Sequence, residues 1–230
     1  MDAEFWSDVV CPYCGLMNHR LHLALERFEH GAEVRLVHRS FQLHQDLPRE
    51  GVSQRQLLVE HGVPQVEHDV LRPLELLAQA EGLTPYHVLD RTLGPTDLAH
   101  ELLAFATEQG RGDEIWTAMF QAHFGHARKL WTRAEVLDFA VEASLDVDAA
   151  ADALDSHRYR ARVLADQDMA QRLGARGTPF LVLGGTHALA GAVSTDDLVS
   201  ALRTAWDARR PAPLGAGDVC TPDGCTSPSA

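Results

Sequence analysis

The sequence has few basic residues and no long apolar run. Lysine and arginine contribute 20 of its 230 residues, aspartate and glutamate contribute 33, and the formal net charge is −13. A nucleic-acid partner requires a positive face, so this balance argues against nucleic-acid binding. No stretch approaches the roughly 18–20 consecutive apolar residues of a membrane-spanning helix, so we also expect no membrane partner.

The start of the chain lacks the pattern of a secretion signal. Residues 1–10, MDAEFWSDVV, open with acidic residues and contain no basic stretch followed by an apolar core. If Met1 is the natural start, we expect a cytoplasmic protein. Cysteines are also scarce, with four in the chain. In the cytosol such cysteines are more often redox-active, catalytic or metal-binding than part of a disulfide framework.

The spacing of the apolar residues changes along the chain. Residues 3–10 predict a short buried strand, and residues 33–41 predict a second one. Between them the apolar residues recur every three or four positions, which predicts an amphipathic helix with Met17, Leu21, Leu25 and Phe28 on one face. Strand, helix and strand in this order predict the βαβ start of a parallel sheet.

The middle of the chain is different, because residues 50–175 show helical patterns separated by Gly and Pro and no strand signals. We expect Pro73 to start or kink one of these helices. Strand signals return at residues 178–191, where Gly184-Gly185 predicts a hairpin turn. We expect Thr195 to cap a last helix.

This order predicts one α/β domain that is interrupted by a large all-helical insertion. We assign residues 1–48 and 174–210 to the α/β domain and residues 49–173 to the insertion. Residues 211–230 form a Pro-, Gly-, Ala- and Ser-rich tail that carries the second cysteine pair.

The first cysteine pair lies in CPYC, residues 11–14, where the predicted strand passes into the predicted helix. Unpaired N–H groups and the helix dipole at a helix N-terminus favour a thiolate, so Cys11 is placed to be a nucleophile. Cys14 lies one turn further on, close enough to form a disulfide with Cys11. Pro12 suits the first helical turn, and Tyr13 would tune the thiolate. The same spacing also suits a zinc site, or two cysteines that are packed in the core without a chemical role. The strand before the motif and the helix after it favour a redox centre.

A second motif, GARGTPFLVL (174–183), places Thr178-Pro179 directly before an apolar strand. Proline cannot donate a hydrogen bond to a sheet, so this position is unusual. A cis peptide bond, which makes a sharp fixed turn, explains it. An ordinary trans proline at a strand start is the alternative, and the order of the motifs favours cis.

With these residues in hand, the chain resembles the DsbA family of the thioredoxin superfamily, and within it the FrnE-like branch of cytosolic dithiol–disulfide oxidoreductases. Four segments carry the resemblance: FWSDVVCPYC, HRSFQLHQDLP (38–48), AHELLAFATEQGRGDEIWTAMFQAHF (99–124) and GARGTPFLVLGG. The similarity runs over almost the whole chain to about residue 206.

The resemblance implies a thioredoxin fold, with a central mixed sheet, flanking helices and a DsbA-like inserted helical domain that caps the active site. It implies that Cys11 is the nucleophile, Cys14 the resolving thiol, and Thr178 with cis-Pro179 the substrate-binding turn. It implies no bound cofactor. Electrons would come from glutathione or a partner dithiol such as the thioredoxin system, and the substrates would be disulfide-containing or unfolded proteins.

The sequence departs from that pattern at two places. Strongly oxidising periplasmic members carry Pro-His between the cysteines, whereas this chain has Pro-Tyr, which suggests a weaker oxidant suited to reduction or isomerisation. Phe5 stands where thioredoxins keep a buried acid. Glu4 and Asp8 are nearby carboxylates that could replace it as a proton relay, or could be solvated or capping groups.

The tail pair, Cys220 and Cys225, flanks the turn sequence TPDG. Some FrnE-like proteins carry such a pair near the C-terminus. We expect an auxiliary redox pair that exchanges with Cys11 and Cys14; a structural disulfide or a zinc site are the alternatives.

Thirteen histidines are scattered along the chain. The pairs His19/His22 and His123/His126 have a helical spacing that could bind a metal, but no acidic partner at a fixed offset supports this. We expect ordinary surface histidines and no metal site.

The leading hypothesis is therefore a cytosolic thiol–disulfide oxidoreductase and protein disulfide isomerase. A glutathione-dependent transferase or isomerase of the kappa-class or chromene-carboxylate isomerase type is the alternative, but those proteins usually have serine at the nucleophile position. A zinc-binding or chaperone protein is the second alternative.

Overall fold

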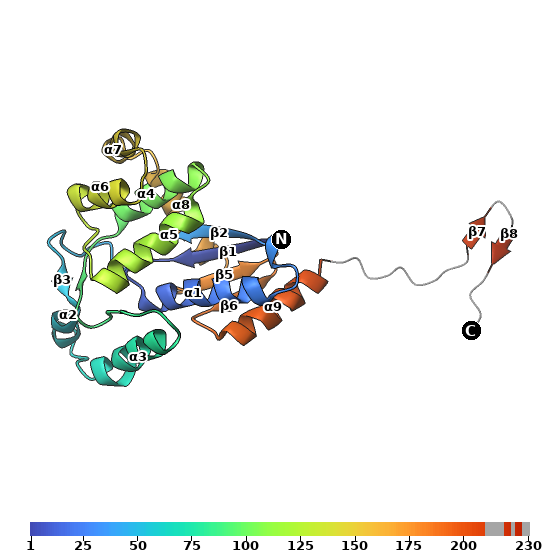
Figure 1. Ribbon diagram of the computed structural model, residues 1–230, viewed down its shortest axis with the longest axis horizontal. Helices are drawn as coiled ribbons and strands as arrows, with labels where there is room; N and C mark the ends of the chain where they lie inside the picture. Colours follow the sequence, from blue (N-terminus) through green and yellow to red (C-terminus); the bar gives the residue numbers. More distant parts are fainter. Residues whose placement is uncertain (210–218, 222–223, 227–230) are drawn as a thin grey trace.

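The computed structural model describes residues 1–209, 219–221 and 224–226. Its centre is a four-stranded sheet in the order β2–β1–β5–β6, shown in Figure 1. The strand β1 (Asp2–Ser7) pairs in parallel with β2 (Arg35–Ser40) and antiparallel with β5 (Phe180–Leu183), which pairs antiparallel with β6 (His187–Ala190). The predicted mixed sheet is confirmed.

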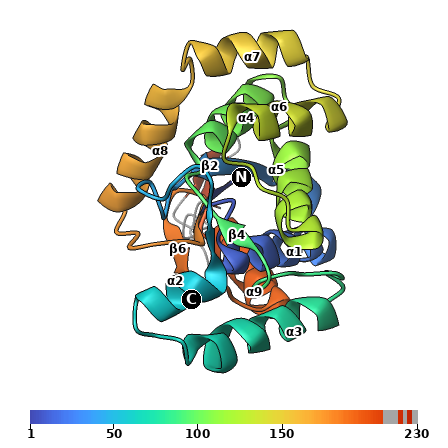
Figure 2. The same ribbon diagram turned by 90° about the vertical axis from the view of Figure 1, so that its left-hand side faces the viewer.

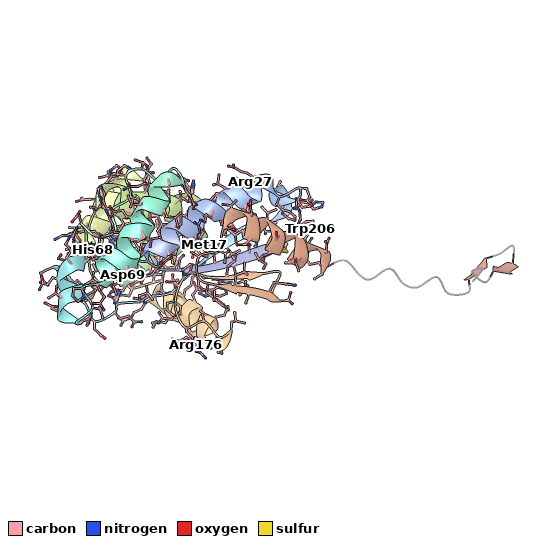
Figure 3. All side chains as sticks on the ribbon, turned by 90° about the horizontal axis from the view of Figure 1, so that it is seen from below. Met17, Arg27, His68, Asp69, Arg176 and Trp206 are labelled. Carbon is pink, nitrogen blue, oxygen red and sulfur yellow. The ribbon has the colours of Figure 1, made fainter. Side chains whose placement is uncertain are left out.

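Helices cover both faces of this sheet because the strands alternate their side chains between the faces. Ala3 and Phe5 of β1 pack against α1 (Pro12–Arg27) and α9 (Thr195–Asp207). Trp6 packs on the opposite side, against α8 (Arg160–Arg172). Figure 3 shows the two layers, with Met17 of α1 and Trp206 of α9 on one side of the sheet and Arg176, just beyond α8, on the other.

The remaining helices lie in the chain between β2 and α8. They are α2 (Gln54–Glu60), α3 (Arg72–Ala80), α4 (Asp97–Glu108), α5 (Gly112–Phe120), α6 (Arg133–Glu142) and α7 (Val147–Asp155), with π-helical turns at Glu67–Leu71 and Gln121–Gly125. A 3-10 turn, Gly31–Glu33, precedes β2. Figure 2 looks onto the end of the molecule where α1 begins and shows α3, α5, α7 and α8 around that end of the sheet. The predicted insertion is therefore largely helical.

Two local predictions are wrong. The middle of the chain does contain strands, because β3 (Val52–Ser53) and β4 (Thr92–Leu93) pair antiparallel. A strand of two residues is too short to show the alternation of apolar and polar residues by which strands are recognised in a sequence. The cap of α9 is Ser194, whose hydroxyl accepts a hydrogen bond from the Asp197 N–H at 3.1 Å, and Thr195 is the first helical residue. Pro73 lies in the first turn of α3, as expected.

The largest cluster of buried side chains joins the insertion to the start of α1. It contains Val9, Val10, Cys11, Cys14 and Leu16 together with buried side chains of α3 to α7. The cysteine motif is therefore part of the core of the insertion. Within the described residues no helix is both long enough and apolar enough to cross a membrane.

The helix α8 lies within the stretch that we assigned to the insertion, yet it packs on the sheet. The Trp6 indole N–H donates to the Asp166 carbonyl at 2.8 Å, and the Asp166 carboxylate accepts from Arg39 at 3.1 Å and from the Ser40 N–H at 3.2 Å. We propose that the α/β domain resumes at α8.

This packing predicts opposite responses to one substitution at two positions of α8. Ala170 is fully buried under the sheet and Ala165 is exposed. Ala170→Leu should lower the free energy of unfolding by about 1–3 kcal/mol because it overpacks this interface. Ala165→Leu should stay within about 0.5 kcal/mol of the wild type. Urea unfolding curves measure both, and equal effects would show that α8 is not held against the sheet.

Candidate active site

The turn after β1 delivers Cys11 to the N-terminus of α1. The Cys11 N–H donates to the Asp8 carbonyl at 3.1 Å, which closes the turn. Cys11 is the N-cap residue with an extended backbone, Pro12 occupies the first turn, and the Cys14 N–H donates to the Cys11 carbonyl at 2.9 Å. The predicted junction between strand and helix is therefore present.

The structure brings the CPYC and TP motifs together although they lie 167 residues apart. The Cys11 Sγ–H donates to the Thr178 carbonyl, with 3.6 Å between the sulfur and the oxygen. The Thr178–Pro179 peptide bond is cis. Both cysteines are free thiols, and Cys11 is 4% exposed whereas Cys14 is fully buried. A reacting group can thus approach the pair through Cys11.

The surroundings separate the pKa values of the two thiols. Hydrogen bonding from Cys14 holds the pKa of Cys11 below its ordinary value, against the opposing effect of burial, and Thr178 lowers it further. Burial raises the pKa of Cys14 well above its ordinary value, and the neighbouring Cys11 adds to this increase. One thiol is thus prepared to ionise, and the other to stay protonated.

The tyrosine that contacts the active-site turn is Tyr86, which the sequence did not indicate. Its hydroxyl donates to the Pro12 carbonyl at 2.5 Å, and its ring stacks on Phe124 with the centroids 4.8 Å apart. Gly15 permits this approach, because a Cβ there would lie 2.5 Å from the Tyr86 oxygen. Tyr13 is 37% exposed, and its predicted tuning role stays a prediction.

A buried arginine, Arg91, contacts the residue before Cys11. It donates to the Val10 carbonyl at 2.8 Å and to Nε2 of His123 at 2.7 Å. Nothing in the local sequence HVLDRTLG indicates this position, because the contact with Val10 spans 81 residues of chain.

The two carboxylates considered as proton relays lie in different places. Asp8 is fully buried beside the cysteines and accepts hydrogen bonds from the Leu43 N–H at 2.6 Å and from His100 at 3.3 Å. Burial raises the pKa of Asp8, but His100, the Leu43 N–H and Thr96 together outweigh that effect, and the net pKa lies below its ordinary value. Glu4 pairs with Arg39. It shares the face of β1 that carries Trp6, opposite α1, so strand alternation excludes Glu4 as a relay to the cysteines.

The prediction of ordinary surface histidines is wrong for His38, His100 and His123, which are buried. His123 bonds to Arg91 and to the Arg128 carbonyl, and burial, with Arg91, lowers its pKa to about 3. The two histidines of the other pair have different partners: His19 contacts the Glu81 carbonyl, and His22 contacts Asp113. Among the described residues there is no cluster of three or more side chains suited to a metal ion.

The tail pair is described through its backbone alone. The strands β7 (Val219–Thr221) and β8 (Gly224–Thr226) form an antiparallel hairpin with Cys220 directly opposite Cys225. The side chains of this predicted redox or structural pair lie outside the described part of the structure.

A pocket of about 330 Å³ lies between α1 and the insertion, and its lining includes Gly15, the residue after Cys14. Gly15, Asn18 and His19 of α1 form one wall, and Tyr86, Phe120 and Phe124 contribute aromatic surface. Its mixed polar and apolar lining suits a small organic molecule.

Comparison with known proteins connects this geometry to one family. The family model described as the DSBA-like thioredoxin domain matches residues 3–203. A probable DsbA oxidoreductase from Streptomyces coelicolor, SCO1869, is 33% identical; the alignment covers 100% of both chains, with a TM-score of 0.83. A comparison with curated proteins found no match.

Two more distant structures share the fold. The cytosolic disulfide reductase DsbM from Pseudomonas aeruginosa is 18% identical over 90% of this chain and 100% of its own, with a TM-score of 0.61. A 2-hydroxychromene-2-carboxylate isomerase is 16% identical over 90% of this chain and 95% of its own, with a TM-score of 0.66.

The hydrogen bond from Cys14 predicts how the pKa of Cys11 responds to replacement of its partner. Cys14→Ser keeps a donor, whereas Cys14→Ala removes it, so the pKa of Cys11 should be higher in the alanine variant than in the serine variant. The rate of iodoacetamide alkylation of Cys11 against pH, read by peptide mass spectrometry, gives both values. Equal values would show that Cys14 does not hold the thiolate.

Proposed function

Because the chain belongs to the family of DsbA-like thioredoxin domains, we propose that it is a thiol–disulfide oxidoreductase whose reacting groups are Cys11 and Cys14. The observation that supports this most is the placement of a dithiol at the N-terminus of α1, with the Cys11 sulfur 3.6 Å from the Thr178 carbonyl. The opposite shifts of the two thiol pKa values fit a nucleophile and a resolving group.

In the first step the Cys11 thiolate attacks one sulfur of a substrate disulfide. A bond forms between Cys11 and that sulfur, the substrate S–S bond breaks, and the other substrate sulfur leaves as a thiolate that takes a proton. We place the substrate strand against Thr178 and Pro179, because the backbone there already lies within hydrogen-bond reach of the Cys11 sulfur.

In the second step Cys14 loses its proton and attacks the Cys11 sulfur. The second substrate thiolate leaves, and the Cys11–Cys14 disulfide forms, so two electrons have passed from the protein to the substrate. Loss of the negative charge on Cys11 in the mixed disulfide removes one of the causes that raise the pKa of Cys14. The resolving thiol is thereby activated after the first bond has formed. The reverse sequence oxidises a substrate dithiol.

We further propose a FrnE-like role in the cytoplasm, with disulfide-containing or unfolded proteins as substrates. Glutathione or the thioredoxin system would reduce the Cys11–Cys14 disulfide back to the dithiol, and no bound cofactor is required. The name and a solved structure of one neighbour support this, since DsbM is described as a cytosolic disulfide reductase and has been solved with glutathione. The Pro12-Tyr13 dipeptide supports reduction or isomerisation over strong oxidation.

A second candidate is a glutathione-dependent isomerase or transferase, and the pocket beside Gly15 is the observation that favours it. Its volume of about 330 Å³ is at the lower end of small-molecule sites. Both cysteines are retained, however, and such a reaction needs one thiol at most. We therefore place it second.

The proposed activity predicts different outcomes for the two cysteines in refolding of a scrambled disulfide protein in glutathione buffer. Cys11→Ser should reduce turnover to the background rate, because the attacking sulfur is gone. Cys14→Ser should accumulate mixed disulfides with the substrate, visible on non-reducing gels, because resolution is lost.

An exposed substitution to serine in α8, Ala165→Ser, is the matched control because it lies on the side of the sheet opposite α1, and it should keep most of the turnover. Wild-type turnover in Cys11→Ser would contradict the proposed oxidoreductase. Conjugation or isomerisation of a small electrophile that survives Cys14→Ser would favour the second candidate.

For the tail we propose exchange between Cys220/Cys225 and the first pair. Cys220→Ser should then slow reoxidation of Cys11 and Cys14 by at least about tenfold, the change that 1.4 kcal/mol in the barrier produces. Stopped-flow measurement of Trp fluorescence during reoxidation tests this, and Ser227→Ala is the control. An unchanged rate would leave a structural disulfide or a zinc site as the alternatives.

A further inference from the structure

Arg91 is a buried cation whose contacts are all with neutral groups. The residue is 6% exposed. Its guanidinium donates to the carbonyls of Val88 at 2.9 Å and Val10 at 2.8 Å, to Nε2 of His123 at 2.7 Å and to Oε1 of Gln54 at 3.2 Å. Within the part of the chain that the structure describes, it forms no salt bridge. Burying a charge without an opposite charge is costly, so the site requires an explanation.

The contact with His123 shows that no second positive charge stands beside this cation. A guanidinium has donors and no acceptor, so Nε2 of His123 must accept, and Nδ1 donates to the Arg128 carbonyl at 2.9 Å. His123 is therefore neutral. Burial lowers the pKa of Arg91 to about 10, which leaves it charged at neutral pH. The guanidinium carbon also lies 5.0 Å from the centre of the Phe124 ring.

The position of the cation relates it to Cys11. Arg91 holds the Val10 carbonyl, in the peptide that precedes Cys11, and Tyr86 holds the Pro12 carbonyl, in the peptide that joins Pro12 to Tyr13. Two side chains of one insertion segment therefore fix the backbone before and after Cys11. The ionisable groups around this turn are Asp8 with His100, Tyr86, Cys11 and Cys14. Asp8 already has His100 as its partner. Cys11 carries a negative charge only when it is reduced and ionised.

We propose that Arg91 is a positioning residue whose fixed charge stabilises the Cys11 thiolate relative to the Cys11–Cys14 disulfide, and so raises the reduction potential of the pair. This role rests on the proposed oxidoreductase function. It explains why a cation without a carboxylate is retained, because its opposite charge is the reacting group itself. The charge of Asp8 acts in the other direction, and the potential reflects the balance of the two.

The affected reaction is the exchange with glutathione. Two glutathione thiols reduce the Cys11–Cys14 disulfide and leave as one glutathione disulfide, so two electrons pass to the protein. The protein then holds the Cys11 thiolate and the Cys14 thiol, and one proton is released. Formation of the disulfide removes an anion whose charge acts on Arg91, so a positive charge at Arg91 favours the reduced side of this equilibrium.

The variant Gln54→Glu tests this with little change of shape. It keeps an oxygen acceptor for Arg91 at the same place and adds a negative charge, which neutralises the guanidinium locally. The pKa of Cys11 should rise, and the equilibrium with glutathione should move toward the disulfide by at least about tenfold, equal to about 30 mV for a two-electron couple. Mass spectrometry of the peptide that carries Cys11 and Cys14, after equilibration at set glutathione ratios, gives the constant.

Gln56→Glu on the same helix is the matched control, because Gln56 is exposed and the change of net charge is identical. It should leave both values unchanged. A folded Gln54→Glu protein with the pKa and equilibrium constant of Gln56→Glu would overturn the role of Arg91.

Substitution of Arg91 itself supplies an independent measurement. Arg91→Gln, if folded, should shift both values in the same direction as Gln54→Glu. Arg91→Lys should stay close to the wild-type values because it keeps the charge. Lower stability with unchanged pKa and equilibrium constant would also overturn the proposal. These outcomes are separate from failure of the proposed function, which would appear as wild-type turnover in Cys11→Ser.

Discussion

The site depends on the contact between the N-terminus of α1 and the segment of the insertion that carries Tyr86 and Arg91. This contact holds the carbonyls of Val10 and Pro12 on either side of Cys11. A helix N-terminus in water would already favour a thiolate. Here the helix start is buried in the core of the insertion, where the same dipoles and charges act in a medium of lower dielectric constant and have larger effects.

The buried surroundings act differently on the pKa values of the two thiols. In the proposed reaction this difference makes Cys11 the attacking thiol and Cys14 the resolving thiol. Cys11 keeps donors around its sulfur, which compensate for the loss of water. Cys14 is enclosed by the same cluster and stays protonated until the charge on Cys11 is removed. In the proposed reaction, an insertion that covers the dithiol would therefore do more than shape a surface for substrates, because it would set the order in which the two sulfurs react.

The core also contains a buried carboxylate, because Asp8 pairs with His100. Asp8 lies at the end of β1, three residues before Cys11, and is fully buried. Arg91 and Asp8 both lie close to the active-site turn. In the proposed role of Arg91, opposed charges from two different parts of the chain would act on Cys11. The family fold fixes where the dithiol stands, while these side chains adjust its chemistry.

Local and periodic features could be predicted from the amino-acid sequence alone. The CPYC motif at a strand–helix junction, the proline before β5 and the helical middle of the chain are such features, because dihedral preferences and apolar periods act over a few residues. The distant groups that contact the cysteines could be identified only from the folded structure. Thr178, Arg91 and Tyr86 contact the active-site turn across 167, 81 and 74 residues of chain, respectively. It also placed α8 under the sheet, buried three histidines and put Glu4 on the face away from α1, because burial and strand facing depend on packing between elements that no local pattern encodes.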